Sequence, residues 1–554
     1  MCSPVVEVLQ VKTTDISRYS AWMAAAAMLL ALAACNDKKT PVETDGGGTP
    51  APLKVETVIF EPKVGVPGDT LLFTAVITSS SQNEGDFPVM EWSANGGSFV
   101  ETNRQTVQWV APNSSGVFTV TAKAKNSVGS STNKATIFIG AGQNLVSENA
   151  GQVTLIGTGN DFHYLNTLDI TRGVDVYKYV GGASSDAVSG AQRNNLNVAY
   201  SPDGALEAHA ADTLAAGATV RPRNIYIGDF NSGTLKRLTT DGTNLGNPEH
   251  NVYNYPSFSP NGQVIAYQRW AQSWDGVKPD SFHVYIEDLV LLKRTVVTAE
   301  YTYPRGFFPT FSTDSNWLIY VLDKNRSGQW ELFGSPMTGN TVDGSSASTV
   351  KMTNTGGTIV SGAPKELKRP PMAWNPVSSV LAIAAADNAL HLVKPSATAP
   401  VDITVPEVAR ASEIVWSPNG SMLAATFLVT DTDGKAWSRI VTVTTAGVVT
   451  ERVSTLIGDI AHDLAFSPDE KWLLYRVTRG SGSWFNVADV GAGILSAPVP
   501  VTATDPVGDS DKYRSAMSLR PSWSGTNIMI YPSFGTSSNG TPGIWTRDLS
   551  GLVD

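Results

Sequence analysis

Cysteine is almost absent from this chain of 554 residues, which contains only Cys2 and Cys35. No disulfide can therefore form within the remainder of the chain, and a large core has to stabilise it. The chain also lacks long runs of one charge, and its net charge is −10. Nothing in it forms the basic face that neutralises phosphate groups, so we expect no nucleic-acid partner.

Motifs for catalysis and metal binding are lacking as well. The sequence has no Gly-x-Ser-x-Gly followed by a hydrolase domain, no His-Glu-x-x-His and no phosphate loop. The six histidines are scattered singly, without metal-ligand spacing. We therefore expect that the protein is not an enzyme and has no catalytic residues, metal site or cofactor. A site assembled from distant residues would leave no local motif, and this alternative stays open.

Turn-forming residues, in contrast, are abundant. The chain contains 49 Gly and 32 Pro, with 42% hydrophobic and only 16% charged residues. Many short strands joined by turns have such a composition. The length exceeds that of one ordinary domain, although a closed β-propeller of several hundred residues is an exception. An all-β protein is predicted.

The longest apolar run, from Ala21 to Ala34, follows Arg18 and is shorter than the roughly 20 residues of a spanning helix. Its length is typical of a secretory leader. The run ends in Leu-Ala-Ala-Cys35, which resembles the lipobox of bacterial lipoproteins. That resemblance implies cleavage after residue 34, a lipid on Cys35 and attachment of the protein to a membrane. A buried apolar helix with an incidental cysteine is the alternative.

The segment 35–52 is rich in Gly, Pro, Thr and charge, so we expect a flexible tether between the lipid and the folded part. Two or three acyl chains hold a protein on a bilayer durably. In the lipoprotein family, Asp directly after the cysteine favours the inner membrane. Here that residue is Asn36, so the resemblance favours the outer membrane, with either face possible. Residues 1–17 are long for a leader's first region, and a start downstream of Met1 is an alternative.

Residues 53–140 change to short alternating runs with turn residues between them, which predicts a β-sandwich. The run from Gly116 alternates so that Phe118, Val120 and Ala122 share one face. Trp92 and Trp109 are expected in the core. Together these residues resemble bacterial Ig-like and PKD-type domains, which serve as spacers or adhesion units.

Residues 143–554 contain a repeat. Each copy has an apolar or aromatic residue, then Ser or Asn, then usually Pro-Asp/Asn-Gly or a relative, then an apolar strand. The Ser or Asn positions are 201, 259, 312, 375, 417, 467 and 524. Pro sets φ for a tight turn, Asp or Asn bonds back to the backbone, and Gly accepts a positive φ. One copy per blade predicts a β-propeller.

These seven copies resemble the propeller repeats of TolB and its relatives. We favour seven blades, and six or eight are alternatives, because the fourth and seventh copies depart from the pattern. The runs Gln152–Ile156 and Val174–Val180 precede the repeats, and we expect one of them to complete the last blade, closing the ring.

Residues just before each innermost strand line the channel mouth in propeller families, and arginine and aromatic residues dominate binding hot spots. The positions predicted to form a binding surface are Arg193, Tyr253, Tyr255, Arg305, Arg369, Glu413, His462, Asp463 and Arg520, with Asn195 and Phe308 beside them. TolB relatives bind partner proteins through such a ring. We therefore expect a cell-envelope scaffold that binds a protein partner. The alternatives are glycan binding or polysaccharide cleavage, and a structural or adhesive surface protein.

Overall fold

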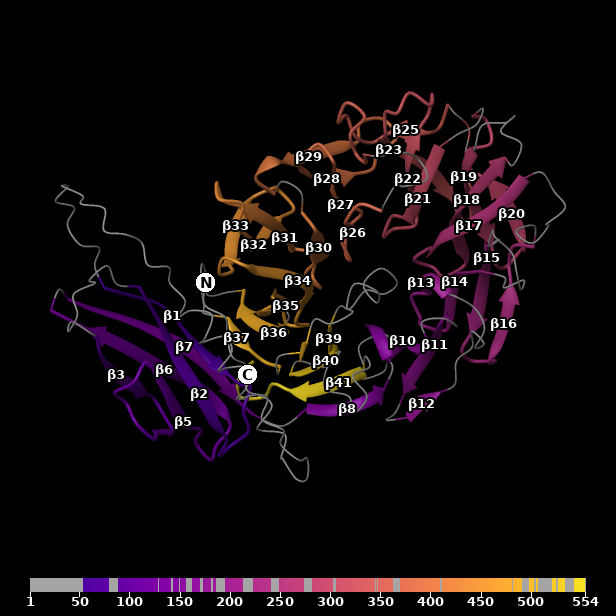
Figure 1. Ribbon diagram of the computed structural model, residues 1–554. Helices are drawn as coiled ribbons and strands as arrows, with labels where there is room; N and C mark the ends of the chain where they lie inside the picture. Colours follow the sequence, from indigo (N-terminus) through magenta and orange to yellow (C-terminus); the bar gives the residue numbers. More distant parts are fainter. Residues whose placement is uncertain are drawn as a thin grey trace, which may run out of the picture. The chain divides into compact units, whose positions relative to one another are not determined.

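A computed structural model provides the structure of the chain (Figure 1). It describes residues 53–553 apart from short gaps and the longer gaps 79–87, 186–194, 213–222, 241–248, 274–280, 362–368, 491–497, 507–520 and 534–542. The chain divides into two units, residues 1–51 and residues 52–554. Cys35 and the predicted leader and tether lie outside the described residues. Within the described residues, no helix is long and apolar enough to span a membrane.

The amino-terminal part of the described chain is a β-sandwich, as predicted. Its strands are β1 (Lys54–Glu61), β2 (Thr70–Thr78), β3 (Val89–Ala94), β4 (Ser98–Phe99), β5 (Thr106–Val110), β6 (Gly116–Lys125) and β7 (Ser130–Ile139). One sheet has the order β1-β2-β5-β4 and the other has the order β3-β6-β7. Val120 and Ala122 are fully buried, and Phe118 packs at the edge of the core, so the predicted alternation of β6 is confirmed.

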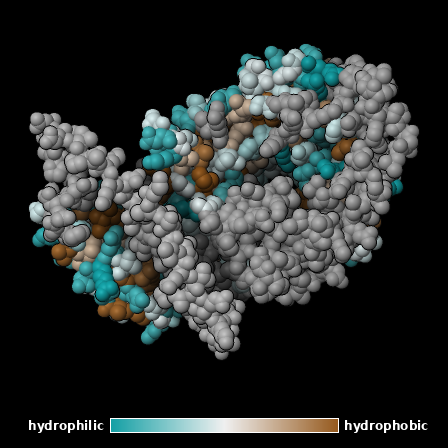
Figure 2. Space-filling model, viewed as in Figure 1, coloured by the Kyte–Doolittle hydropathy of each residue, from teal (hydrophilic) through white to brown (hydrophobic). Residues whose placement is uncertain are grey.

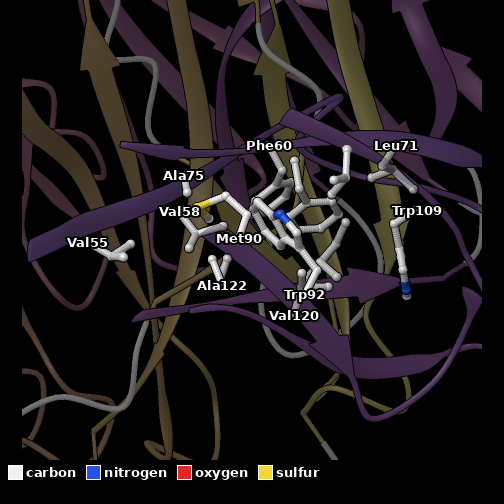
Figure 3. Close-up of a cluster of buried hydrophobic side chains, with 14 of the residues drawn as sticks. Val55, Val58, Phe60, Leu71, Ala75, Met90, Trp92, Trp109, Val120 and Ala122 are labelled. Atoms are coloured by element: carbon white, nitrogen blue, oxygen red, sulfur yellow. The ribbon is translucent and has the colours of Figure 1, made fainter. Parts of the chain in front are cut away.

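Apolar side chains from both sheets fill the space between them (Figure 3). Trp109 is fully buried, and its ring packs edge-on against Phe73 with centroids 5.7 Å apart. Its indole Nε1 donates a hydrogen bond to the Gly96 carbonyl oxygen at 3.0 Å. Trp92 is buried as well and donates to the Arg104 carbonyl oxygen at 2.8 Å. Both tryptophans are therefore core residues, as the sequence predicted.

The rest of the described chain consists of antiparallel sets of strands that follow one another in chain order (Figure 1). The first set consists of β9 (Ala150–Leu155), β10 (Phe162–Asp169), β11 (Gly173–Val180) and β12 (Ala183–Ser185). The second set consists of β13 (Asn195–Tyr200), β14 (Leu206–Asp212), β15 (Arg223–Asp229) and β16 (Thr234–Arg237). The third set consists of β17 (Glu249–Phe258), β18 (Val264–Ser273), β19 (Ser281–Asp288) and β20 (Lys293–Val296). Then come β21 (Arg305–Phe311), β22 (Trp317–Asp323), β23 (Glu331–Thr338), β24 (Thr341–Val342) and β25 (Val350–Lys351).

The fifth set consists of β26 (Met372–Trp374), β27 (Leu381–Ala384), β28 (Leu390–Lys394) and β29 (Val401–Val405), and the sixth of β30 (Glu413–Trp416), β31 (Met422–Thr430), β32 (Ala436–Thr444) and β33 (Val449–Ser454). The seventh set consists of β34 (Asp459–Phe466), β35 (Trp472–Arg479), β36 (Gly482–Asp489), β37 (Val499–Pro500) and β38 (Asp505–Pro506). The last set consists of β39 (Ser522–Ser524), β40 (Ile528–Ser533) and β41 (Gly543–Asp548) together with β8 (Gln143–Glu148) from the beginning of the propeller. Apolar clusters fill the spaces between successive sets. This is the architecture of a β-propeller.

Closure of the propeller follows the expected principle with a different strand. The strand that pairs with β41 is β8, with Gly543 opposite Glu148. The two runs named from the sequence instead become β9 and β11 of one separate sheet. Our assignment of the closing strand was therefore wrong. The two predicted runs, around Gln152 and Val174, cannot close the last set because both pair with β10, which lies between them. The strand that remains to pair with β41 is β8.

In the described residues there are eight antiparallel sets, namely β9–β12, β13–β16, β17–β20, β21–β25, β26–β29, β30–β33, β34–β38 and β39–β41 with β8. The parallel pairs β15–β17 and β19–β21 join the second, third and fourth sets into one 13-stranded sheet. Seven of the eight sets begin with a copy of the Ser/Asn motif. The eighth, β9–β12, has no copy, and for this reason the motif count of seven falls one short of the number of strand sets.

Each motif forms the turn between the first and second strands of its set. Ser201 Oγ donates to Asp203 Oδ1 at 2.6 Å and accepts from the Leu206 backbone N–H at 2.8 Å. The final turn residue is left-handed in five copies, with φ of 67° at Gly204, 69° at Gly262, 59° at Ser315, 70° at Gly420 and 63° at Glu470. The turn chemistry predicted from the sequence is therefore confirmed, including at positions without glycine.

Candidate functional site

The first strand of each set lies at the inner side of the propeller. Contacts join β13 to β17, β17 to β21, β26 to β30 and β30 to β34, so that first strands of successive sets are neighbours. Equivalent residues of different repeats are thereby brought close together. We define the inner rim as five of the residues that stand four positions before the motif Ser, namely Asn197, Tyr255, Phe308, Glu413 and Asp463.

Four inner-rim residues have a left-handed backbone, with φ of 52° at Asn197, 53° at Tyr255, 54° at Phe308 and 60° at Asp463. In each case the pairing between first and second strand shifts register at this point, which marks a β-bulge. Left-handed φ is uncommon for non-glycine residues and unusual for a bulky ring. Such outliers persist where the surroundings hold them, and they gather at functional sites.

Neighbouring repeats contact one another through the rim. Asn197 Nδ2 donates to Asn254 Oδ1 at 2.6 Å, which joins β13 to β17. The ring of Tyr255 packs edge-on against Phe308, with centroids 4.9 Å apart, which joins β17 to β21. Phe308 is buried, while Tyr255 remains partly exposed. One part of the rim is therefore aromatic.

The other part of the rim is charged. The Glu413 carboxylate accepts the backbone N–H groups of Asp463 at 2.6 Å and Leu464 at 3.1 Å, so a side chain of β30 satisfies the bulge of β34. Asp463 Oδ2 lies 2.9 Å from Nδ1 of His462 and 3.0 Å from Nε of Arg476. Glu413 and Arg476 are buried, while His462 and Asp463 are partly exposed. The contacts of these groups with one another stabilise this part of the rim.

Arg305 begins β21 and pairs with the end of β22. Its Nη1 donates to Asp323 Oδ2 at 3.2 Å. The Asp323 carboxylate is fully buried and also accepts the backbone N–H groups of Ser327 and Gly328, both at 2.9 Å. Arg305 therefore has a structural role, because it neutralises a buried carboxylate.

Arg369 precedes β26 and is exposed. Burial raises the pKa of Tyr255, and the charges of Arg369 and Arg223 act in the opposite direction. The phenol of Tyr255 therefore stays a neutral hydrogen-bonding group beside positive charge. Tyr255 of the inner rim and Arg369, whose charge acts on it, are the groups best placed to meet a partner, since one is partly exposed and the other is exposed.

The remaining predicted site residues divide into two groups. Tyr253 is 1% exposed and packs edge-on against Tyr267 and Tyr285, so it is a core residue and not part of a binding surface. Arg193 and Arg520 lie outside the described residues. Asn195 begins β13.

Sequence reasoning missed the partners of the rim: Asn197, Asn254, Asp323 and Arg476. Asn197 was detectable, because it stands four positions before Ser201, as Tyr255 does before Ser259. Asp323 and Arg476 carry no such signal, because each lies on the second strand and meets its partner only through strand pairing.

The arrangement offers hydrogen bonding, aromatic contact and positive charge. In the part of the chain that the structure describes, no three His, Cys, Asp or Glu side chains gather as metal ligands would.

Comparison with known proteins supports the division of the chain. Residues 53–139 match the PKD domain family. They form a PKD domain. The PKD domain thus precedes the propeller, as the sequence resemblance implied. The comparison with curated proteins found no match.

Solved structures similar to the chain include an oligogalacturonate lyase in complex with manganese, with 10% identity, coverage of 88% of this chain and 99% of the lyase, and a TM-score of 0.41. A prolyl endopeptidase has 13% identity, covers 73% of this chain and 54% of its own, and gives a TM-score of 0.44. The β-propeller domain of the Trilobed protease from Pyrococcus furiosus has 10% identity, coverage of 65% and 97%, and a TM-score of 0.36. At such similarity their activities have no bearing on this chain.

Proposed function

We propose that the protein is a lipid-anchored scaffold of the bacterial cell envelope, which binds a protein partner through the inner rim of its propeller and catalyses no reaction. The observation that carries this proposal is the rim itself: left-handed bulges recur at equivalent positions of four repeats. Backbone strain of this kind costs about 1–3 kcal/mol per residue, so a set of four is expected to serve a function.

The chemistry of the rim supports a protein as the ligand. Tyr255 combines an apolar ring with a neutral hydroxyl group, and Arg369 adds an exposed guanidinium group. Tyrosine and arginine are the residues that contribute most to protein–protein hot spots. Glycan binding and a purely adhesive role remain the competing outcomes.

The test of the binding surface is crosslinking of whole envelopes followed by recovery of the protein. We expect one specific partner, lost in Tyr255→Ala and in Arg369→Glu. Lys394→Glu is the matched control, because Lys394 is an exposed cation at the end of β28. Charge reversal at Arg305 is unsuitable, because it would place two carboxylates together at Asp323. Unchanged capture by both Tyr255→Ala and Arg369→Glu, or equal loss with the control, would refute the proposal.

The anchor has a separate test. The chain offers its own matched control, since it has two cysteines. We expect labelling with radioactive palmitate in the wild type and in Cys2→Ser, and no labelling in Cys35→Ser. Protease treatment of intact cells then separates surface exposure from a periplasmic location at the expected outer membrane. Labelling that survives in Cys35→Ser would exclude Cys35 as the lipidated residue, and no labelling of the wild type would exclude the anchor. Both outcomes would leave the binding proposal untouched.

A further inference from the structure

The turn between β19 and β20 exposes three consecutive large apolar side chains. Val290 is 66% exposed, Leu291 71% and Leu292 61%. In the described residues this is the longest run of exposed large apolar residues. Figure 2 shows hydrophobic residues on one face of the molecule in small groups among hydrophilic ones. A single exposed apolar residue needs no explanation, but three in succession at the tip of a turn do.

The turn of the preceding set has the same architecture and a different surface. In the β15–β16 turn, Asp229 Oδ1 accepts the backbone N–H groups two and three residues later, at 2.8 and 3.3 Å. In the β19–β20 turn, Asp288 Oδ1 does the same at 2.8 and 2.9 Å. The three residues just before the outer strand are Asn-Ser-Gly in the first turn and Val-Leu-Leu in the second. The backbone therefore does not require the apolar residues.

The last position of the turn makes the apolar choice costly. It is left-handed in both turns, with φ of 66° at Gly233 and 54° at Leu292. Leucine in a left-handed conformation is strained, whereas glycine is not. A residue that opposes the folding preference of its own turn and is exposed to solvent is expected to serve an interaction.

Basic residues follow this apolar tip and occur on the outer strand of the preceding set. Lys293 directly follows it and is exposed. Arg294 Nη2 donates to the Leu238 carbonyl oxygen at 3.1 Å, which joins β20 to the segment that follows β16. Lys236 and Arg237 of β16 are exposed as well. Arg294 is in part neutralised by Glu287, at 3.1 Å. The two outer strands thus carry three further cations, of which Arg294 lies two residues beyond the tip and bonds to the segment that follows Lys236 and Arg237.

We propose that Val290–Leu292 inserts into an anionic lipid surface, with the cations of β16 and β20 among the headgroups. Apolar residues flanked by lysine and arginine are typical of segments that lie in a membrane interface. A protein partner fits less well, because leucine and valine are under-represented in protein–protein hot spots.

Insertion of three side chains is weak on its own, and it becomes effective when a second attachment already holds the protein at the bilayer. The physiological role of the tip therefore rests on the envelope location proposed above. The insertion itself does not need a lipid on Cys35, and the two proposals can fail separately.

The first test uses a fluorescent reporter on the full chain. Replacing both native cysteines by serine leaves no other thiol, so Leu291→Cys can carry a single polarity-sensitive dye. Because this chain has no lipid on residue 35, the vesicles are supplied in large excess to reveal weak insertion. We expect a blue shift with vesicles of phosphatidylcholine and phosphatidylglycerol, and a smaller one with phosphatidylcholine alone. Ser232→Cys, at the equivalent position of the β15–β16 turn, is the matched control. No shift at position 291, or an equal shift at position 232, would overturn the proposal.

The second test exchanges the turns. The triple variant Val290→Asn, Leu291→Ser, Leu292→Gly takes the sequence of the sister turn and is expected to fold at least as well, because glycine relieves the left-handed leucine. We expect its partition into anionic vesicles to fall at least about tenfold, which corresponds to only about two buried methylene groups. Unchanged partition contradicts the proposal. Loss of the crosslinked protein partner without any change in vesicle binding would identify a protein as the occupant.

Discussion

The PKD domain and the propeller are stabilised in different ways. In the described part of the PKD domain, all buried side chains but Lys63 are hydrophobic, and most of them form one cluster. The propeller divides its core among several clusters and buries many polar and charged residues, among them Asp323, Glu413 and Arg476. The small sandwich therefore depends mainly on close packing, while the propeller also depends on hydrogen-bonded charges.

The exception strengthens this contrast. Lys63 Nζ donates to the Phe60 carbonyl oxygen at 2.8 Å and lies 3.1 Å from Glu61. It also lies 5.2 Å from the ring centroid of Trp484 in the propeller. Burial lowers its pKa, and the charge of Glu61 opposes that shift. The buried cation of the PKD domain thus occurs where this domain meets the propeller.

Removal of a core aromatic ring should have the largest effect. Trp109→Ala deletes a fully buried ring that packs against Phe73 and Phe118. We expect a loss of about 3–5 kcal/mol in the free energy of unfolding, since the cavity cannot collapse fully. Denaturant unfolding followed by intrinsic fluorescence measures this loss. Val89→Ala, at an exposed position of β3, is the control and should change stability little. A small loss in Trp109→Ala would mean that packing does not dominate this domain.

How far the sequence predicts each region follows the same contrast. The alternation in β6 identifies Val120 and Ala122 as core residues, because every second residue of a half-buried strand faces the core and is apolar. The motif turns are predictable for a similar reason, since Ser201 and Asp203 bond within one turn. The charged contacts are not: Asp463 and Arg476 lie on different strands, and only strand register brings them together. The sequence did not identify β8 as the closing strand, because β8 is no more apolar than β9 and nothing local distinguishes the two.

Removal of the cation from a buried charge pair tests whether the propeller depends on hydrogen-bonded charges. Arg476→Met keeps much of the side-chain volume and leaves Asp463 without this cation. We expect a loss of about 2–3 kcal/mol, below the cost for a fully buried pair, because Asp463 retains some contact with water. Arg476→Met combined with Asp463→Asn should recover part of the loss. If the single variant were as stable as the wild type, hydrogen-bonded charge would not be needed for propeller stability.

A histidine in the propeller makes this dependence sensitive to pH. His391 is buried, with Nδ1 2.8 Å from Asp402 and Nε2 2.9 Å from Asp387. An imidazole that donates from both nitrogens is protonated. Burial alone would lower the pKa of His391, but hydrogen bonds and charges of the two aspartates outweigh it, so its pKa is raised.

A raised folded pKa gives stability that is fully present below the unfolded pKa of about 6.5 and is lost as the pH rises through the folded pKa. We therefore expect the propeller's thermal midpoint to fall from mildly acidic to alkaline pH. His391→Gln should flatten this dependence above about pH 7. His283→Gln serves as the control in that range, because burial lowers the pKa of His283 to about 4 and its imidazole is then neutral in both the folded and the unfolded chain. The same pH slope in His391→Gln would show that another group is responsible.

The smallest effect concerns the motif turns, where the propeller's stability is local and can be compared between repeats. Ser315 adopts φ of 59°, at the position where Gly204, Gly262 and Gly420 stand in other copies. Ser315→Gly relieves the left-handed strain but increases the freedom of the unfolded chain, so we expect a gain of about 0.5 kcal/mol. Gly420→Ala is the reverse change and should destabilise, because its added Cβ would approach Asn375 Oδ1 to 2.2 Å. Differential scanning calorimetry resolves both shifts if they are confined to the propeller transition. A Ser315→Gly variant that loses stability would mean that its hydroxyl, and not only its backbone, supports the turn.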